Sequence, residues 1–188
     1  MTAPPYPALD SEIRVHVGQG EFEVTDRHNL VFSTILGSCV SACIRDPSLG
    51  IGGMNHFLLP AAPGSGADDR RYGVQAMELL VNALLAMGAN RHRLEAKVFG
   101  GGRMSAGLVD IGSKNVTFVR QFLKDEGIPI VSESLGGLQA RRIHFWPATG
   151  RAKQQLVADP GLAARERALA ERASRVVERE PVGDLELF

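Results

Sequence analysis

Hydrophobic and polar residues alternate along the first third of the chain, which is the pattern of β-strands that bury one face. The alternation predicts strands at residues 13–17, 21–25 and 30–36. Only the glycine-rich sequence GQG separates the first two strands, so they are expected to form a short hairpin.

A second hairpin is predicted within residues 34–60, where SCVSACIR and GIGGMNHFLL flank the turn sequence DPSL. If Arg45 pairs with Gly50 across this turn, Cys39 lies directly opposite His56, and opposite side chains on one face are in contact. A slipped register would make the two residues diagonal neighbours or turn His56 to the other face. The pairing therefore depends on the chemistry of the turn.

Farther along, the period of the hydrophobic residues changes to that of a helix. A first helix is predicted from Asp68 to a stop at Gly88, with one apolar face formed by Val74, Met77, Val81, Leu84 and Leu85. A second helix is predicted at residues 113–126, where Gly127 supplies the C-terminal cap.

Strands return at residues 93–102, 128–133 and 141–147, whereas residues 151–188 are rich in Ala, Arg and Glu and predict a marginal helix and a frayed tail. Strands outnumber helices, and tight turns join several of them. This favours a layered α+β fold, with a largely antiparallel or mixed sheet and helices over one face.

The predicted organisation is a flexible N-terminus at residues 1–12, one catalytic domain at residues 13–158 and a helical extension at residues 159–188. Composition agrees with a soluble globular protein, since 22% of the 188 residues are charged and 44% are hydrophobic. The 21 basic and 21 acidic side chains cancel, so the charge suggests neither nucleic acid nor an anionic membrane as a partner. Two cysteines and no leader-like N-terminus favour the cytoplasm, and no apolar run is long enough to cross a bilayer.

Cys39 and His56 are the candidate catalytic residues, because an imidazole is the usual partner that converts a cysteine thiol to the nucleophilic thiolate. The glycine turn that precedes Cys39 allows backbone N–H groups at Ser38 and Cys39 to face a developing oxyanion. Glycines are expected to keep the substrate's path open on both sides of the site: Gly52 and Gly53 beside His56, and Gly100, Gly101 and Gly102 in the following turn.

Two other interpretations of these residues remain open. Cys39 and Cys43 can be small core residues, with His56 a hydrogen-bonded strand residue. A metal site is disfavoured, because residues 39 and 43 of one strand lie about 13 Å apart and no fourth ligand is evident. We therefore expect no metal and no cofactor.

Five motifs span most of residues 13–150 in order: LGSCVSACIRD, GIGGMNHFLLP, KVFGGGRM, IGSKNVTFVRQFLKDEGIPIV and HFWPATG. Together they resemble one family, the chemoreceptor glutamine deamidases of bacterial chemotaxis, known as CheD. The resemblance implies a three-layer α/β/β fold similar to the catalytic domain of cytotoxic necrotising factor toxins. It also implies hydrolysis of receptor glutamine amides to glutamate, and in some members hydrolysis of glutamyl methyl esters.

By this resemblance the catalytic cysteine is Cys39, the histidine is His56, and the family's third residue, usually threonine, falls on Ser33. In the segment SLGGLQARRI (134–143), Leu135 and Ala140 differ from the residues that are usual in the family. Contacts of this loop with a partner or substrate are therefore not implied by the resemblance. The implied partners are the cytoplasmic signalling helices of chemoreceptors, with other chemotaxis proteins as further candidates. The rivals are a noncatalytic adaptor that uses the same surface, and a thiol protease or transglutaminase with the same chemistry.

Overall fold

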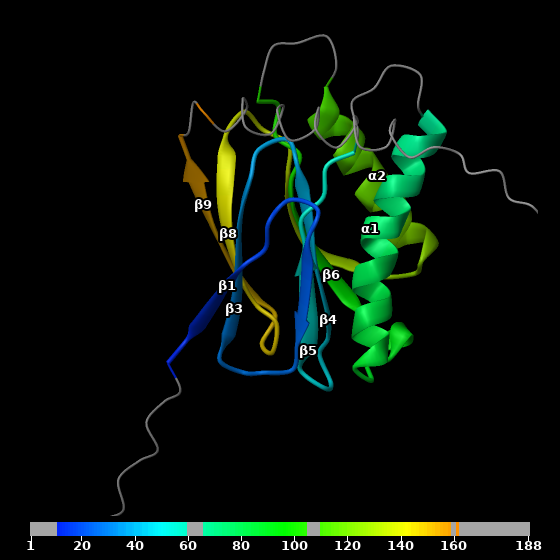
Figure 1. Ribbon diagram of the computed structural model, residues 1–188, viewed down its shortest axis with the longest axis vertical. Coiled ribbons are helices and arrows are strands. Elements are labelled where there is room, and N and C mark those ends of the chain that lie inside the picture. Colours follow the sequence, from blue (N-terminus) through cyan, green and yellow to red (C-terminus); the bar gives the residue numbers. More distant parts are fainter. Residues whose placement is uncertain (1–10, 60–65, 105–109, 159–160, 162–188) are drawn as a thin grey trace, which may run out of the picture.

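The computed structural model describes residues 11–59, 66–104, 110–158 and 161, and its elements form three layers (Figure 1). One layer holds two helices, the middle layer is a five-stranded sheet, and the outer layer is a four-stranded sheet. The helices are α1 (Gly66–Ala86), α2 (Ile111–Asp125) and a short 3-10 helix, η1 (Arg91–Arg93). The predicted α+β fold with α/β/β layers is confirmed.

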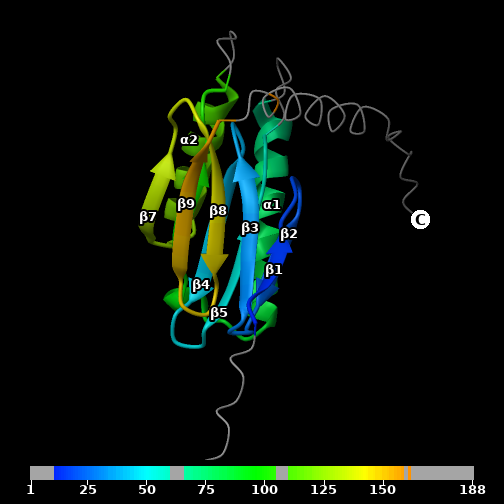
Figure 2. The ribbon, with the colours of Figure 1, turned by 90° about the vertical axis from the view of Figure 1, so that its left-hand side faces the viewer.

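The middle sheet has the strand order β2-β5-β4-β6-β7. The outer sheet, which faces the viewer in Figure 2, has the order β1-β3-β8-β9. The strands are β1 (Ile13–His16), β2 (Phe22–Thr25), β3 (Leu30–Leu36), β4 (Val40–Asp46), β5 (Ile51–Asn55), β6 (Glu95–Gly100), β7 (Ile130–Leu135), β8 (Ala140–Trp146) and β9 (Arg151–Val157). Two pairs, β1 with β3 and β6 with β7, are parallel, and the other pairs are antiparallel. Both sheets are therefore mixed, as the short connections and the crossovers of the chain require.

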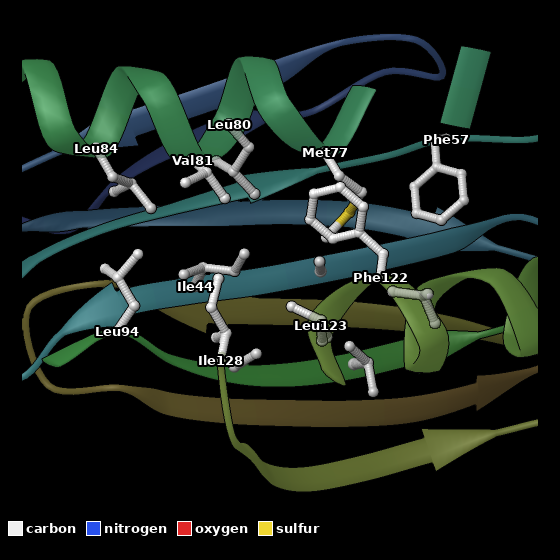
Figure 3. Packing of buried hydrophobic residues seen from close by; sticks show 14 of the residues in the cluster. Ile44, Phe57, Met77, Leu80, Val81, Leu84, Leu94, Phe122, Leu123 and Ile128 are labelled. Carbon is white, nitrogen blue, oxygen red and sulfur yellow. The ribbon is translucent and has the colours of Figure 1, made fainter. Parts of the chain in front are cut away.

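A hydrophobic core fills the space between the helices and the middle sheet (Figure 3). Helix α1 contributes Met77, Leu80, Val81 and Leu84, which the 3.6-residue period places on one face. Full burial of each large aliphatic side chain stabilises the fold by about 1.5–3 kcal/mol. The predicted apolar face of this helix is thus the one that packs on the sheet.

A second core lies between the two sheets, and both cysteines belong to it. It also contains Phe32 of β3, Met54 of β5 and Phe145 of β8. The alternation along β4 directs Cys43 into this space and Ala42 and Ile44 toward the helices. The candidate chemistry is therefore located at the inter-sheet face and not under the helices.

The predicted hairpin of residues 13–17 and 21–25 is wrong. Strand β1 pairs in parallel with β3 in the outer sheet, whereas β2 pairs with β5 in the middle sheet. The GQG turn thus carries the chain from one sheet to the other. Alternation along each strand is the same in either arrangement, so it could not reveal that the two strands have different partners.

Residues 151–157 form strand β9 at the edge of the outer sheet, where a helix was expected to begin. Most side chains of this strand are exposed, because an edge strand needs few apolar positions, and Ala152 is the one that packs against the inter-sheet core. The expectation for residues 162–188 lies outside the described residues. No helix within the described ranges is both long and apolar enough to span a bilayer.

A buried carboxylate stabilises the turn between β4 and β5. Asp46 is fully buried, and it accepts hydrogen bonds from the backbone N–H groups of Ser48 at 3.0 Å and Asn90 at 2.9 Å. The guanidinium of Arg93 donates to both of its oxygens. This guanidinium is the main reason that the pKa of Asp46 is lowered to about 2, and the two backbone N–H groups lower it further.

Replacing Asp46 with asparagine is expected to destabilise the protein by about 1–3 kcal/mol, because the amide cannot accept the same hydrogen bonds from Arg93. The folded-state pKa lies below the unfolded value, so the stabilisation by Asp46 is complete above about pH 4 and is lost as the pH falls toward 2. Urea unfolding of the unchanged protein and of Asp46→Asn, at pH 7 and near pH 2.5, measures the difference in their stability. An equal difference in stability at the two pH values would contradict the assignment.

Candidate active site

Cys39 and His56 are brought together by the hairpin of β4 and β5, but not in the predicted register. Asp46 pairs with Ile51, so the turn occupies the four residues after Asp46 and every pair is shifted. Val40 and Phe57 form a bridge in which each N–H donates to the other's carbonyl, at 3.0 and 2.9 Å.

This register makes Cys39 and His56 diagonal neighbours, so the expectation that they are directly opposite is wrong. Cys39 precedes Val40, and His56 precedes Phe57 on the antiparallel partner. Both side chains therefore belong to the inter-sheet face, where diagonal neighbours remain within reach of a long side chain. Cys39 is fully buried and His56 is 7% exposed, so the pair is shielded from bulk water.

Thr34 of β3 holds the imidazole of His56. Its Oγ1 lies 2.8 Å from His56 Nδ1 and donates its one proton to the carbonyl of Val17, also at 2.8 Å. The same carbonyl lies 3.4 Å from Nδ1. A carbonyl can only accept, and a hydroxyl that donates to it has no proton left for Nδ1, so this arrangement favours a proton on Nδ1 that is donated to Thr34. In the neutral ring, Nε2 is then the basic nitrogen.

Ser33 does not occupy the position that the sequence assigned to it. Successive side chains of a strand point to opposite faces, and the inward side chains of β3 are Phe32, Thr34 and Leu36. Ser33 therefore lies on the outer face, paired with His144 of β8. The alternation of Phe32 and Leu36 around Thr34 was the signal in the sequence that could have identified the threonine.

Replacing Thr34 with valine is expected to lower the turnover number by about 10- to 100-fold, because His56 loses the acceptor that fixes its tautomer. Thr34→Ser keeps the hydroxyl and should retain most of the activity. Ser33→Ala, the matched change one residue away, should leave turnover close to that of the unchanged protein. Steady-state kinetics of the three variants measure this, and a larger loss in Ser33→Ala than in Thr34→Val would refute the assignment.

Cys43 does not have the properties of a nucleophile. It is 1% exposed, and burial raises the pKa of its thiol to about 12. At neutral pH it is a protonated core side chain, as one of the alternative interpretations of the sequence holds. Among the residues that the structure describes, no group of three or more His, Cys, Asp or Glu side chains could hold a metal ion.

Three glycines at the end of β6 and directly after it hold the backbone of residues 37–39 in place. The N–H of Gly101 donates to the carbonyl of Cys39, and the N–H of Gly102 donates to the carbonyl of Gly37, both at 2.7 Å. Gly100 has φ +110°, and a Cβ there would collide with the Cys39 carbonyl. These glycines lie beside the site as expected, and their part in admitting a substrate stays a prediction.

Gly52 and Gly53 do not border the site, and their expected part in substrate access is wrong. Gly53 pairs with Ile44, and Gly52 pairs with Arg45, near the turn end of the hairpin. A Cβ on Gly53 would lie 2.7 Å from Leu80 of α1, and one on Gly52 would lie 2.9 Å from a side-chain carbon of Pro147. Both glycines are therefore needed for close packing of the layers.

Asn115 of α2 is a site residue that the sequence pattern did not predict. It is fully buried; its Nδ2 donates to the carbonyl of Ser38 at 2.9 Å, and its Oδ1 accepts from the N–H of Leu59 at 2.9 Å. One side chain thus ties the residue before Cys39 to the segment after His56. Its signal in the sequence was an amide on the helical face that also carries Val119 and Phe122.

Gln19, in the turn between β1 and β2, was also missed. The thiol of Cys39 donates to Gln19 Oε1 at 3.7 Å, a contact that joins residues twenty positions apart. Tyr72 of α1 is close enough that burial first, and then the charge of an ionised Cys39, raise the pKa of its phenol. No hydrophobic pattern marks a polar turn residue as part of a site.

Comparisons with known protein sequences identify a family. A family model described as CheD chemotactic sensory transduction matches residues 58–155. A protein of Caulobacter sp. (strain K31) is 54% identical over 178 residues, which cover 94% of this chain and 93% of that protein. Proteins of Caulobacter vibrioides (strain NA1000 / CB15N) and Rhizobium meliloti (strain 1021) are 58% and 60% identical, covering 78% and 75% of this chain and 79% of each relative. All three are named probable chemoreceptor glutamine deamidase CheD.

Proposed function

The chain belongs to the CheD family, and from this premise we propose that it hydrolyses the side-chain amide of particular glutamines on chemoreceptors. The observation that carries the proposal is the inter-sheet arrangement of Cys39, His56 and Thr34, in which a thiol and an oriented imidazole share one face. Relatives with more than half of their residues in common carry the matching name.

The first half of the proposed reaction forms a thioester. His56 Nε2 takes the proton of the Cys39 thiol, and Sγ attacks the carbonyl carbon of the glutamine side chain. The carbonyl electrons move to oxygen, and backbone N–H groups at Ser38 and Cys39 are the proposed donors to this oxyanion. The C–N bond then breaks, and His56 gives its proton to the departing ammonia.

The second half consumes water. His56 Nε2 takes a proton from water, whose oxygen attacks the thioester carbon. The C–S bond then breaks, His56 returns its proton to the Cys39 sulfur, and the released side-chain acid ionises to glutamate. Thr34 keeps Nδ1 protonated throughout, so the same nitrogen, Nε2, serves in both halves. A receptor glutamyl methyl ester would follow the same steps with methanol as the leaving group.

The proposed substrate is a helix-borne glutamine on the cytoplasmic signalling part of a receptor, which places the protein in the cytoplasm. Such a side chain extends its carboxamide away from the helix axis, whereas the helical backbone is hydrogen-bonded and shielded. The new negative charge on the receptor helix then alters helix packing, and this is the proposed contribution to adaptation. Other chemotaxis proteins are proposed as further partners.

Mass spectrometric peptide mapping tests this proposal. The purified protein is incubated with receptor signalling domains, with free glutamine as a parallel sample. The expected result is conversion of a few receptor glutamines to glutamate, no backbone cleavage, and no release of ammonia from free glutamine, because contacts to the receptor helix supply the positioning. Receptor fragments, or rapid turnover of free glutamine, would instead identify a protease or a general amidase.

A further inference from the structure

We propose that Gln19 is a further catalytic residue, whose side-chain amide donates a hydrogen bond to the oxyanion formed when Cys39 attacks a carbonyl. The inference rests on the proposed function, and it adds a donor that neither the family's match nor the sequence identifies. Its starting observation is the contact of Gln19 Oε1 with Cys39 Sγ at 3.7 Å.

The turn that carries Gln19 is fixed to His56 itself. The N–H of Gly20 donates to the carbonyl of His56 at 2.7 Å, and the N–H of His56 donates to the carbonyl of Glu21 at 3.0 Å. The turn is closed by Glu21, whose carboxylate accepts from the N–H of Gly18 at 2.8 Å. Hydrogen bonds to the backbone of His56 therefore fix the turn that carries Gln19, and its half-buried side chain contacts Cys39.

The carboxamide can both accept from the thiol and donate to the oxyanion. In the resting protein the S–H group of Cys39 donates to Oε1. When His56 removes that proton, the sulfur can only accept. A half-turn of the terminal amide then exchanges Oε1 for the Nε2 group at little cost, because this torsion is soft and two-fold.

The geometry places this donor where charge develops. The oxyanion is attached to the carbon that bonds to Sγ, so it forms only two bonds from the atom that Gln19 contacts. Two neighbouring backbone N–H groups are not available for this task, because those of Gly101 and Gly102 donate to the carbonyls of Cys39 and Gly37. The side chain of Gln19, in the turn between β1 and β2, would supply a further donor besides the proposed backbone N–H groups of Ser38 and Cys39.

Two reactions of the Cys39 thiol separate this role from a merely structural one. Acylation by p-nitrophenyl acetate passes through an oxyanion, whereas alkylation by iodoacetamide does not. Gln19→Ala should slow acylation of Cys39 by about 100-fold or more while the alkylation rate stays close to that of the unchanged protein. Gln155→Ala, the same change at an exposed position of β9, should alter neither rate.

Gln19→Glu provides a second, independent readout. The carboxylate can only accept, so acylation should be slowed as in Gln19→Ala. Its negative charge beside Sγ disfavours the thiolate, so the pH profile of alkylation should move to higher pH. Alkylation at an unshifted pH would mean that residue 19 does not contact the sulfur, and would overturn the proposal.

Equal loss of acylation and alkylation in Gln19→Ala, or an unchanged or faster acylation, would also overturn it. Receptor kinetics provide the matching test, with a lower turnover number and a nearly unchanged KM expected for Gln19→Ala. If the unchanged protein is acylated at Cys39 but deamidates no receptor domain, the proposed function fails while the test of Gln19 still stands.

Discussion

Replacing Cys39 with alanine is expected to lower receptor deamidation by about 10⁴-fold or more, because the variant lacks the sulfur that forms the proposed thioester. The variant should remain folded, since alanine fits this fully buried position, immediately before β4, with the loss of one sulfur atom. Initial rates of deamidation and thermal unfolding of the same preparation measure the two effects together.

Cys43→Ala is the matched control for this result. The same chemical change four residues along the chain removes a thiol that burial keeps protonated, so most of the turnover should remain. Any loss of activity in this variant should parallel its loss of stability. If Cys39→Ala and Cys43→Ala were both folded and lost turnover equally, the assignment of Cys39 as the nucleophile would be contradicted.

Replacing His56 with asparagine is expected to lower the turnover number by about 10²- to 10⁴-fold, the usual contribution of a general acid–base group. Asparagine retains a polar side chain beside Thr34 and the Val17 carbonyl but has no basic nitrogen. Receptor binding should be preserved, because His56 is 7% exposed and offers little surface to a partner.

Turnover and KM measured with a receptor signalling domain separate these effects. A raised KM with an unchanged turnover number would show that His56 contributes to binding and not to the chemistry. A loss of cooperative unfolding would identify His56 as a structural residue, as the alternative interpretation of the sequence holds.

The layers of the fold could be predicted because hydrophobic periodicity reports which face of each element is buried. Helix α1 and strand β3 follow this rule, whereas β4 is buried on both of its faces. Periodicity does not report which strand is the partner. The prediction of a hairpin at residues 13–25 was wrong for this reason. Strand β9 was not predicted, because an exposed edge strand shows almost no apolar pattern.

The site was predictable to the extent that the turn chemistry determines a hairpin. The sequence DPSL located the turn, and a shift of the paired residues by one on each strand kept Cys39 and His56 on one face. Ser33 was assigned by its distance from Cys39 in the sequence, whereas the sheet alternation selects Thr34. Gln19 and Asn115 reach the site through contacts between distant segments, which no local pattern encodes.

Trapping with hydroxylamine tests the central claim, a thioester at Cys39, most directly. Hydroxylamine competes with water for an acyl-enzyme but does not itself convert a glutamine amide under mild conditions. Peptide mapping of the receptor domain should then find glutamyl hydroxamate at the same positions that become glutamate without the reagent, and neither product with Cys39→Ala. Glutamate alone in the presence of hydroxylamine, or hydroxamate formed by Cys39→Ala, would contradict the account.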